Sequence, residues 1–172
     1  MTKRRASYLG ALAIAAFVLA FPSPGEDFQG KVVRIVDGDT VEVLHGQRAQ
    51  RIRLYGVDAP EKSQPFGSRA RQFTAGLVFG HTVSVREKGR DRYGRALAEI
   101  RLSDGRSLNR ELVTNGFAWH YKHYSNDLGL AEMEEIARKQ KRGLWVDTRP
   151  IAPWEFRKFE RQQNAIGAGI RQ

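Results

Sequence analysis

The sequence predicts an α+β domain, because five short β-rich segments are interrupted by one segment with helical spacing and followed by two more. The 172-residue chain suits a single domain, and with 41% apolar residues it can bury a core without cross-links. It contains no cysteine, which excludes disulfides, thiolate metal sites and cysteine nucleophiles.

The predicted strands are rich in β-branched residues and are separated by turn residues. An Asp37-Gly38 turn follows the first strand, and the second alternates apolar and polar residues as it returns. The first three strands therefore form a β-meander. The five strands are predicted over residues 31–36, 40–44, 51–55, 81–86 and 96–102.

Three segments have the spacing of amphipathic helices. In the first, Phe66, Ala70, Phe73 and Leu77 recur on one face, and Gly80 ends the pattern. The helices are predicted over residues 65–79, 108–115 and 130–141. This order of elements fits a five-stranded β-barrel of the oligonucleotide/oligosaccharide-binding (OB) type with about three α-helices at one end.

The chain is basic, with 29 Lys and Arg against 19 Asp and Glu, which gives a net charge of +10. Such a charge favours polyanionic partners, namely nucleic acid, anionic lipid or acidic polysaccharide, without choosing among them.

The N-terminus is typical of a secretory signal. Lys3, Arg4 and Arg5 precede an uncharged run over residues 8–21, and a small residue, Ala20, ends the predicted signal peptide. An uncleaved membrane anchor is the alternative, but the run is shorter than the ~20 residues that a spanning helix needs. Cleavage would leave 26 basic and 19 acidic residues, or +7, in a secreted or periplasmic protein.

The rest of the chain divides by composition. The predicted organisation is a signal peptide over residues 1–20, a linker over 21–29, one folded domain over 30–155 and a polar basic tail over 156–172.

Two acidic motifs lie at predicted strand ends, Asp37-Gly38-Asp39-Thr40 and Asp58-Ala59-Pro60-Glu61. Oxygen-rich clusters of this kind suit hard cations such as Ca²⁺ or Mg²⁺. Ordinary turn chemistry explains either motif taken alone.

Two arginines change the interpretation of these acids. Arg53 alternates with Ile52 and Leu54, so it faces away from the core, and Arg95 stands at the entrance to the fifth strand. Carboxylates, a metal and guanidinium groups are the components of phosphodiester cleavage, since guanidinium groups bind phosphoryl oxygens in pairs. Glu61 could then position or deprotonate the attacking water.

A pair of histidines, His120 and His123, offers a zinc site as another interpretation. Zinc sites usually need more ligands than two lone histidines, and the chain has no cysteine, so a surface or stacking role is favoured. Trp119, Trp145 and Trp154 are expected to pack in the core or at a hinge.

Three blocks of sequence identify a family. Residues 37–41, 53–61 and 91–98 read DGDTV, RLYGVDAPE and DRYGRALA, and they resemble the staphylococcal (micrococcal) nuclease family in order and spacing. Residues 112–118 and 142–145 look like its later helical landmarks. The resemblance spans roughly residues 29–155.

The resemblance implies a role for each acidic residue. Asp39 and Asp58 match the family's Ca²⁺ ligands, and Ala59 matches a position that ligates through its backbone carbonyl, where the type enzyme has Thr. Asp37 matches an acid that supports the metal through its outer shell, and Glu61 matches the proposed general base.

The same resemblance implies the groups that bind substrate. Arg53 and Arg95 match the arginines that bind the scissile phosphate and stabilise the transition state. The predicted substrate-binding residues are Arg92, Tyr93, Lys122 and Tyr124, of which Lys122 stands where the type enzyme has a tyrosine.

Taken together, the resemblance implies a Ca²⁺-dependent nuclease that hydrolyses DNA and RNA with low sequence specificity and leaves 3′-phosphate ends. Its substrates would be single-stranded or locally open, and the protein would be a monomer without a protein partner or stable membrane association once the signal is cleaved. The alternative from another class is a non-catalytic nucleic-acid-binding OB module. A membrane-tethered nuclease depends only on whether the first segment is retained.

Overall fold

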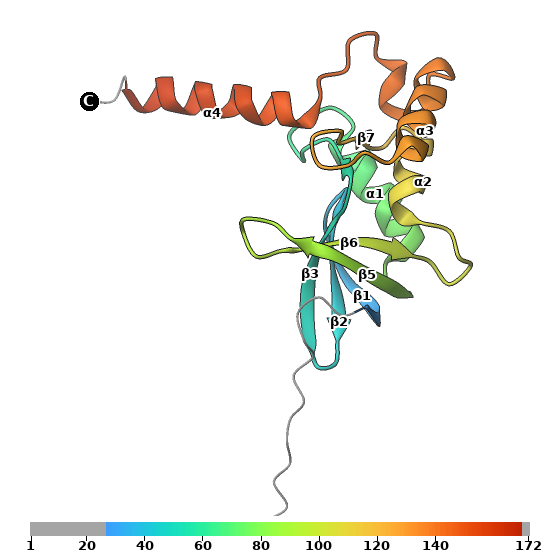
Figure 1. Ribbon diagram of the computed structural model, residues 1–172. Coiled ribbons are helices and arrows are strands. Elements are labelled where there is room, and N and C mark those ends of the chain that lie inside the picture. The colour runs from blue at the N-terminus through green and yellow to red at the C-terminus, as the bar shows by residue number, and fades with distance from the viewer. Residues whose placement is uncertain (1–26, 170–172) are drawn as a thin grey trace, which may run out of the picture.

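This computed structural model describes residues 27–169, with side chains as far as Ile166. The predicted signal peptide, most of the predicted linker and the last three residues lie outside this range. A closed five-stranded barrel forms one end of the molecule, with strand order β1-β2-β3-β6-β5 (Figure 1). Its strands are β1 (Phe28–Asp37), β2 (Thr40–His45), β3 (Arg48–Leu54), β5 (Thr82–Arg90) and β6 (Ala96–Arg101). The predicted α+β fold with an OB-type barrel is confirmed.

Two non-hairpin pairings close the barrel. β1 pairs with β5 antiparallel, and β3 pairs with β6 parallel, with Ile52 opposite Ala96. Because side chains alternate along each strand, Ile52 and Leu54 are buried inside the barrel while Arg53 between them points to the other face. Buried aliphatic side chains fill the interior: Val32, Val41, Val43, Ile52, Leu54, Val83, Val85 and Ile100.

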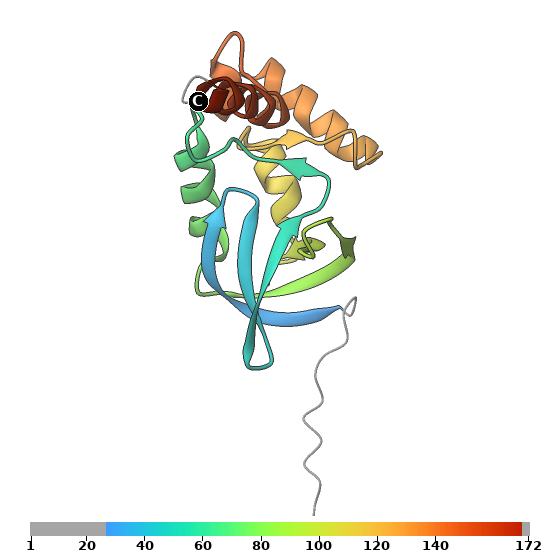
Figure 2. The same ribbon diagram turned by 90° about the vertical axis from the view of Figure 1, so that its left-hand side faces the viewer.

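The helices gather at the end of the molecule opposite the tip of the β2–β3 hairpin (Figures 1 and 2). They are α1 (Gly67–Val78), α2 (Leu108–Thr114), α3 (Leu128–Lys139) and α4 (Pro153–Gly169), with a 3₁₀ turn η1 (Gly143–Val146). A two-stranded ladder, β4 (Val57–Asp58) and β7 (Trp119–His120), lies between helices and barrel. α4 projects away from the other helices (Figure 1). Within residues 27–169, no helix has both the length and the apolar character to cross a membrane.

The structure differs from the sequence expectations at several places. β1 begins at Phe28, inside the predicted linker, because the Phe28 ring stacks on His45 at 3.9 Å and its backbone pairs with Val85. α1 begins at Gly67 because Phe66 has a left-handed backbone with φ of 68°. The polar segment after residue 155 is helical as far as Gly169, a fourth helix that the sequence analysis did not predict.

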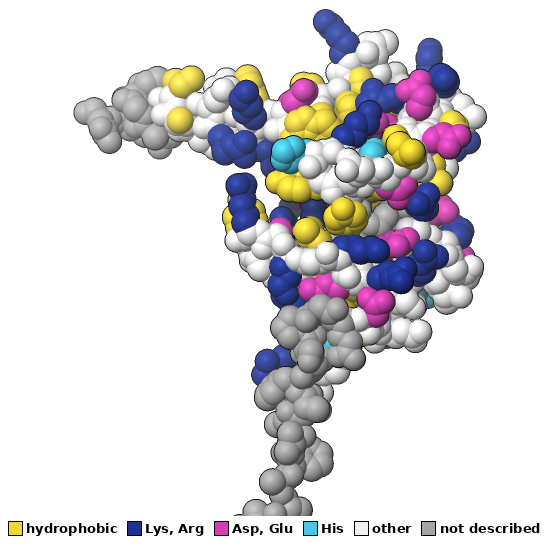
Figure 3. All heavy atoms as spheres, in the orientation of Figure 1, with side chains coloured by type: hydrophobic (Ala, Val, Ile, Leu, Met, Phe, Trp, Pro, Cys, Tyr) yellow, Lys and Arg dark blue, Asp and Glu magenta, His cyan; other side chains and the backbone are white. Residues whose placement is uncertain are grey.

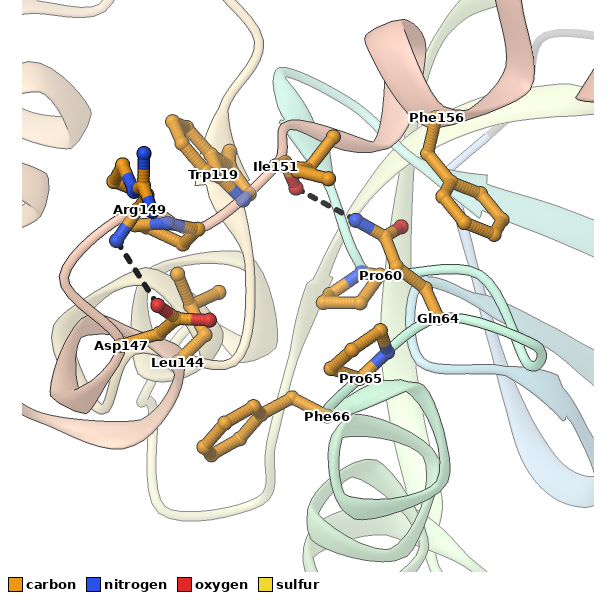
Figure 4. Close-up of a pocket in the computed structure, with 11 residues that line it drawn as sticks. Pro60, Gln64, Pro65, Phe66, Trp119, Leu144, Asp147, Arg149, Ile151 and Phe156 are labelled. Atoms are coloured by element: carbon orange, nitrogen blue, oxygen red, sulfur yellow. Dashed lines mark hydrogen bonds between the residues drawn. The ribbon is translucent and has the colours of Figure 1, made fainter. Parts of the chain in front are cut away.

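A second, smaller core joins the helices to the start of α4. Trp119 and Trp145 meet edge to face at 4.4 Å, and Trp119 also meets Trp154 at 5.6 Å, so the expected packing role of the tryptophans is confirmed. A cavity of about 100 Å³ adjoins this cluster (Figure 4). Across it, Gln64 Nε2 donates a 2.6 Å hydrogen bond to the carbonyl of Ile151, just before α4 (Figure 4).

Candidate functional site

The turn between β1 and β2 packs closely against α1 and the loop that follows β4. A Cβ atom on Gly38 would lie 2.8 Å from the Cβ atoms of both Ala59 and Ala70. The hydroxyl of Thr74 donates a 2.5 Å hydrogen bond to the Gly38 carbonyl, which fixes the turn on α1. Asp39 at the end of this turn is therefore held beside the loop that follows β4.

Two buried carboxylates face one guanidinium group. Asp39 and Asp58 are 1% and 0% exposed. Arg53 Nη1 donates to Asp39 Oδ1, and Arg53 Nη2 donates to Asp58 Oδ1 at 2.5 Å. The backbone N–H of Ala59 donates to Asp39 Oδ2 at 2.6 Å. The structure thus brings together four of the residues that the sequence predicts for the site.

Burial dominates the electrostatics of this group. Burial raises the pKa of Asp39 to about 6, Asp58 adds to the rise, and Arg53 opposes it. Burial also works against the charged form of Arg53, but Asp39 and Asp58 outweigh it and raise the pKa of that guanidinium. Burial likewise raises the pKa of Asp37.

Glu61 is positioned by the loop between β4 and α1. Its backbone N–H donates to Gln64 Oε1 at 3.1 Å. A Cβ atom on Gly67 would lie 1.9 Å from the Glu61 carbonyl oxygen, so this close approach requires glycine. The Glu61 carboxylate accepts a 2.5 Å hydrogen bond from Arg157 Nη1 on α4, and the same guanidinium contacts Asp58.

A cleft of about 690 Å³ opens over these groups. In Figure 3, Lys and Arg side chains lie on the lower side of α4 and on the projection below it, which is the β5–β6 hairpin in Figure 1. The predicted residues that line the cleft are Asp37, Arg53, Glu61, Arg92, Tyr93, Arg95 and Tyr124. Asp39, Asp58 and Ala59 are buried beside it.

Arg95 is held by an acid on the same hairpin. Its Nε donates to Asp91 Oδ2 at 2.6 Å, and its backbone N–H donates to Asp91 Oδ1 at 2.9 Å. Partial burial works against the charged form of Asp91, but the hydrogen bonds from Arg95 prevail and lower the pKa of that carboxyl. Asp91 therefore fixes the position from which Arg95 faces the cleft.

Tyrosine side chains contribute to the lining of the cleft. Tyr93 is 69% exposed, and the guanidinium of Arg92 lies 4.9 Å from its ring centroid. Tyr124 meets Tyr121 edge to face at 4.9 Å. Lys122 is placed elsewhere: it does not line the cleft, and its Nζ lies 3.8 Å from Glu134 on α3.

The donor set around Asp39 fits a hard cation. Ca²⁺ prefers carboxylate oxygens, backbone carbonyls and water, and two buried carboxylates lie side by side on Arg53. Across residues 27–169, no three His, Cys, Asp or Glu side chains gather into a complete ligand group. The chain would therefore supply Asp39 and Asp58, with the Ala59 carbonyl as the predicted main-chain ligand and water completing the shell. Within the same residues the two histidines belong to no such group; His120 is buried, against the expected surface role, and His123 is exposed.

Sequence reasoning missed several residues of the cleft. Arg157 and Arg161 come from α4, which was expected as a tail, and Tyr121 stacks on Trp154 at 5.1 Å. The four-residue separation of Asp91 and Arg95 is a local signal that predicts an ion pair. No local pattern indicates Arg157, because its partner Asp58 is 99 residues away in sequence.

Comparisons with known proteins identify the family of this chain. The family model described as staphylococcal nuclease homologue matches residues 51–147. An uncharacterized endonuclease of Escherichia coli O157:H7 is 42% identical over 146 residues, covering 85% of this chain and 95% of its own length. A micrococcal nuclease of Shigella flexneri is 42% identical over 160 residues, covering 87% and 92%. A staphylococcal-like nuclease of Arabidopsis thaliana is 36% identical over 131 residues, covering 76% of this chain and 40% of its own length.

Proposed function

The chain belongs to the staphylococcal nuclease family and is a nuclease, and we propose that it uses Ca²⁺ to hydrolyse DNA and RNA with low sequence specificity. One observation carries the proposal. Arg53 joins the buried carboxylates of Asp39 and Asp58 beside a cleft that Glu61 and Arg95 also line.

The residues divide the chemistry among them. Asp39 and Asp58 would hold the cation, which when bound neutralises phosphate charge and favours attack at phosphorus. Glu61 accepts the proton of the attacking water. Departure of the 5′ oxygen leaves a 3′-phosphate end.

The two guanidinium groups stabilise the charge that develops on the phosphoryl oxygens. Arg53 donates one N–H to Asp39 and one to Asp58. Three of the five N–H donors of its guanidinium therefore remain for phosphate. Arg95 approaches from the β5–β6 hairpin, where Asp91 orients it.

The cleft supports binding of the backbone more than of particular bases. Its lining carries several arginines, and phosphate contacts hold a strand without reading its sequence. Tyr93 and Tyr124 are exposed and can stack on unpaired bases of any type. Single-stranded or locally open nucleic acid is therefore the proposed substrate.

Cleavage of a labelled single-stranded oligonucleotide by the purified protein tests the proposal. We expect cleavage with CaCl₂, loss of cleavage with a calcium chelator, and products that a polymerase cannot extend until their 3′-phosphates are removed. Cleavage that persists in the chelator would overturn the metal mechanism. Binding without cleavage in either condition would support the non-catalytic OB module instead.

Export is the second part of the proposal. Lys3, Arg4 and Arg5 followed by the uncharged run over residues 8–21 support a cleaved signal peptide and a secreted or periplasmic location. Mass spectrometry of the protein recovered from cell fractions tests it. A full-length chain in the membrane fraction would favour the tethered nuclease.

A further inference from the structure

Arg157 occupies the two carboxylates that the reaction needs free. Its Nη2 lies 2.8 Å from Asp58 Oδ2, and its Nη1 lies 3.1 Å from Asp58 Oδ1 and 2.5 Å from Glu61 Oε1. Both oxygens of Asp58 and one oxygen of Glu61 thus accept hydrogen bonds from α4. Arg53 Nη2 also donates to Asp58 Oδ1, so that oxygen already has two donors.

Packing at the start of α4 holds Arg157 in this place. Trp154 stacks on Tyr121 with ring centroids 5.1 Å apart and planes 3° apart, and Ala152 and Pro153 are buried. The side chain of Gln64 bridges two segments. Its Oε1 accepts a hydrogen bond from the backbone N–H of Glu61, and its Nε2 donates one to the carbonyl of Ile151. The first turn of α4 is therefore attached to the loop that carries Glu61.

The rest of α4 makes few contacts with the domain. The side chains of residues 158–166 are exposed, and Glu160 contacts Ser63 at 3.2 Å. Lys158 is exposed, and no ion pair is found for it within residues 27–169. The ion pairs of α4 with Asp58 and Glu61 thus come from one guanidinium, that of Arg157.

We propose that Arg157 is a positioning residue of the active site, which holds Asp58 and Glu61 and competes with the divalent cation for them. The inference rests on the proposed use of Ca²⁺. A cation on Asp58 needs an oxygen that Arg157 now uses, and two positive charges at one carboxylate repel each other. Cation binding therefore displaces the guanidinium, and by reciprocity the guanidinium weakens cation binding. Its departure also frees the Glu61 oxygen for the water.

Calcium titration calorimetry with CaCl₂ alone tests the competition. We expect Arg157→Gln to bind Ca²⁺ about tenfold more tightly than the wild type. Arg157→Lys should lie between them, because a compact ammonium cannot pair with both acids as a fork does. Lys158→Gln removes the same charge from the next position of α4 and should leave the dissociation constant unchanged.

Nitrogen-15 NMR of arginine side chains gives a readout within the wild-type protein. The Arg157 Nε–H signal, identified by its loss in Arg157→Gln, should shift or broaden when Ca²⁺ saturates the site. An unchanged signal, or equal calcium affinity in wild type and Arg157→Gln, would overturn the inference while leaving calcium use intact. No calcium binding by any of the variants would overturn the proposed function and the inference together.

Discussion

Asp39 Oδ2 accepts a 2.6 Å hydrogen bond from the backbone N–H of Ala59, which ties the end of the β1–β2 turn to the residue after Asp58. The bond crosses 20 positions of sequence and lies wholly inside the protein. It sets the separation of the two carboxylates through the main chain, so the acids are arranged before any ligand arrives.

Loss of Arg95 should abolish most activity without unfolding the protein. Arg95→Ala should lower the cleavage rate by about 10²–10³-fold, since it removes a charge that stabilises the transition state. Asp91→Asn keeps Arg95 but weakens the hydrogen bond that orients its guanidinium. This variant should therefore lose less activity than Arg95→Ala. Single-turnover cleavage rates and circular dichroism measure the two effects. Near-wild-type cleavage by Arg95→Ala would show that this residue does not act on the phosphate.

The buried Asp39 should make the calcium-free protein less stable as the pH rises. Its pKa is about 6 in the folded state against 3.8 as the ordinary value, so the folded state binds more protons between these pH values. The free energy of unfolding should therefore fall between about pH 4 and pH 6, by about 2 kcal/mol for this group.

Urea denaturation of the wild type and Asp39→Asn in chelator checks this expectation. Because Asn does not titrate, the stability of the variant relative to the wild type should rise between pH 4 and pH 7. A constant difference across this range would mean that Asp39 stays ionised when buried.

Two glycines of the same region should respond oppositely to alanine. In Gly67→Ala, the new Cβ would meet the Glu61 carbonyl at 1.9 Å, so unfolding free energy should drop by about 1–3 kcal/mol and activity should fall with the displaced Glu61. Gly76→Ala in the same helix meets nothing within 4 Å and should gain about 0.5–1 kcal/mol. Thermal denaturation of both variants provides the comparison.

Arg161 should contribute to substrate binding through charge alone. It lines the cleft from α4, so Arg161→Ala should weaken binding of single-stranded DNA in chelator and reduce the salt slope by about 0.7. Lys31→Ala on β1, outside the cleft lining, is the matched control. Fluorescence anisotropy at several salt concentrations measures the salt dependence of DNA affinity for each variant. An equal slope in Arg161→Ala and in the wild type would show that Arg161 does not contact the bound strand.

The barrel and much of the site could be predicted because their signals are local. Alternation along β3 places Ile52 and Leu54 inside and Arg53 outside, as the structure shows. The motifs around Asp39 and Asp58 mark strand ends. Their roles in metal binding and catalysis stay predictions, to be tested as described above.

Other features depend on contacts between distant segments and leave no local signal. α4 is more polar than α1, and its side chains over residues 158–166 are exposed. Arg157 meets Asp58 only through the tertiary fold. On α3, the apolar Ile136 is 41% exposed, whereas the acidic Glu134 is buried and pairs with Arg138 and Lys122.

The parallel pairing of β3 with β6 has a consequence for the order of assembly. Arg53 lies opposite Leu97 in this ladder, and Arg95 directly precedes β6. The pairing that brings the two arginines to one cleft is therefore also one of the two that close the barrel. A nascent or unfolded chain holds neither in place, and during refolding nuclease activity should return no earlier than barrel closure.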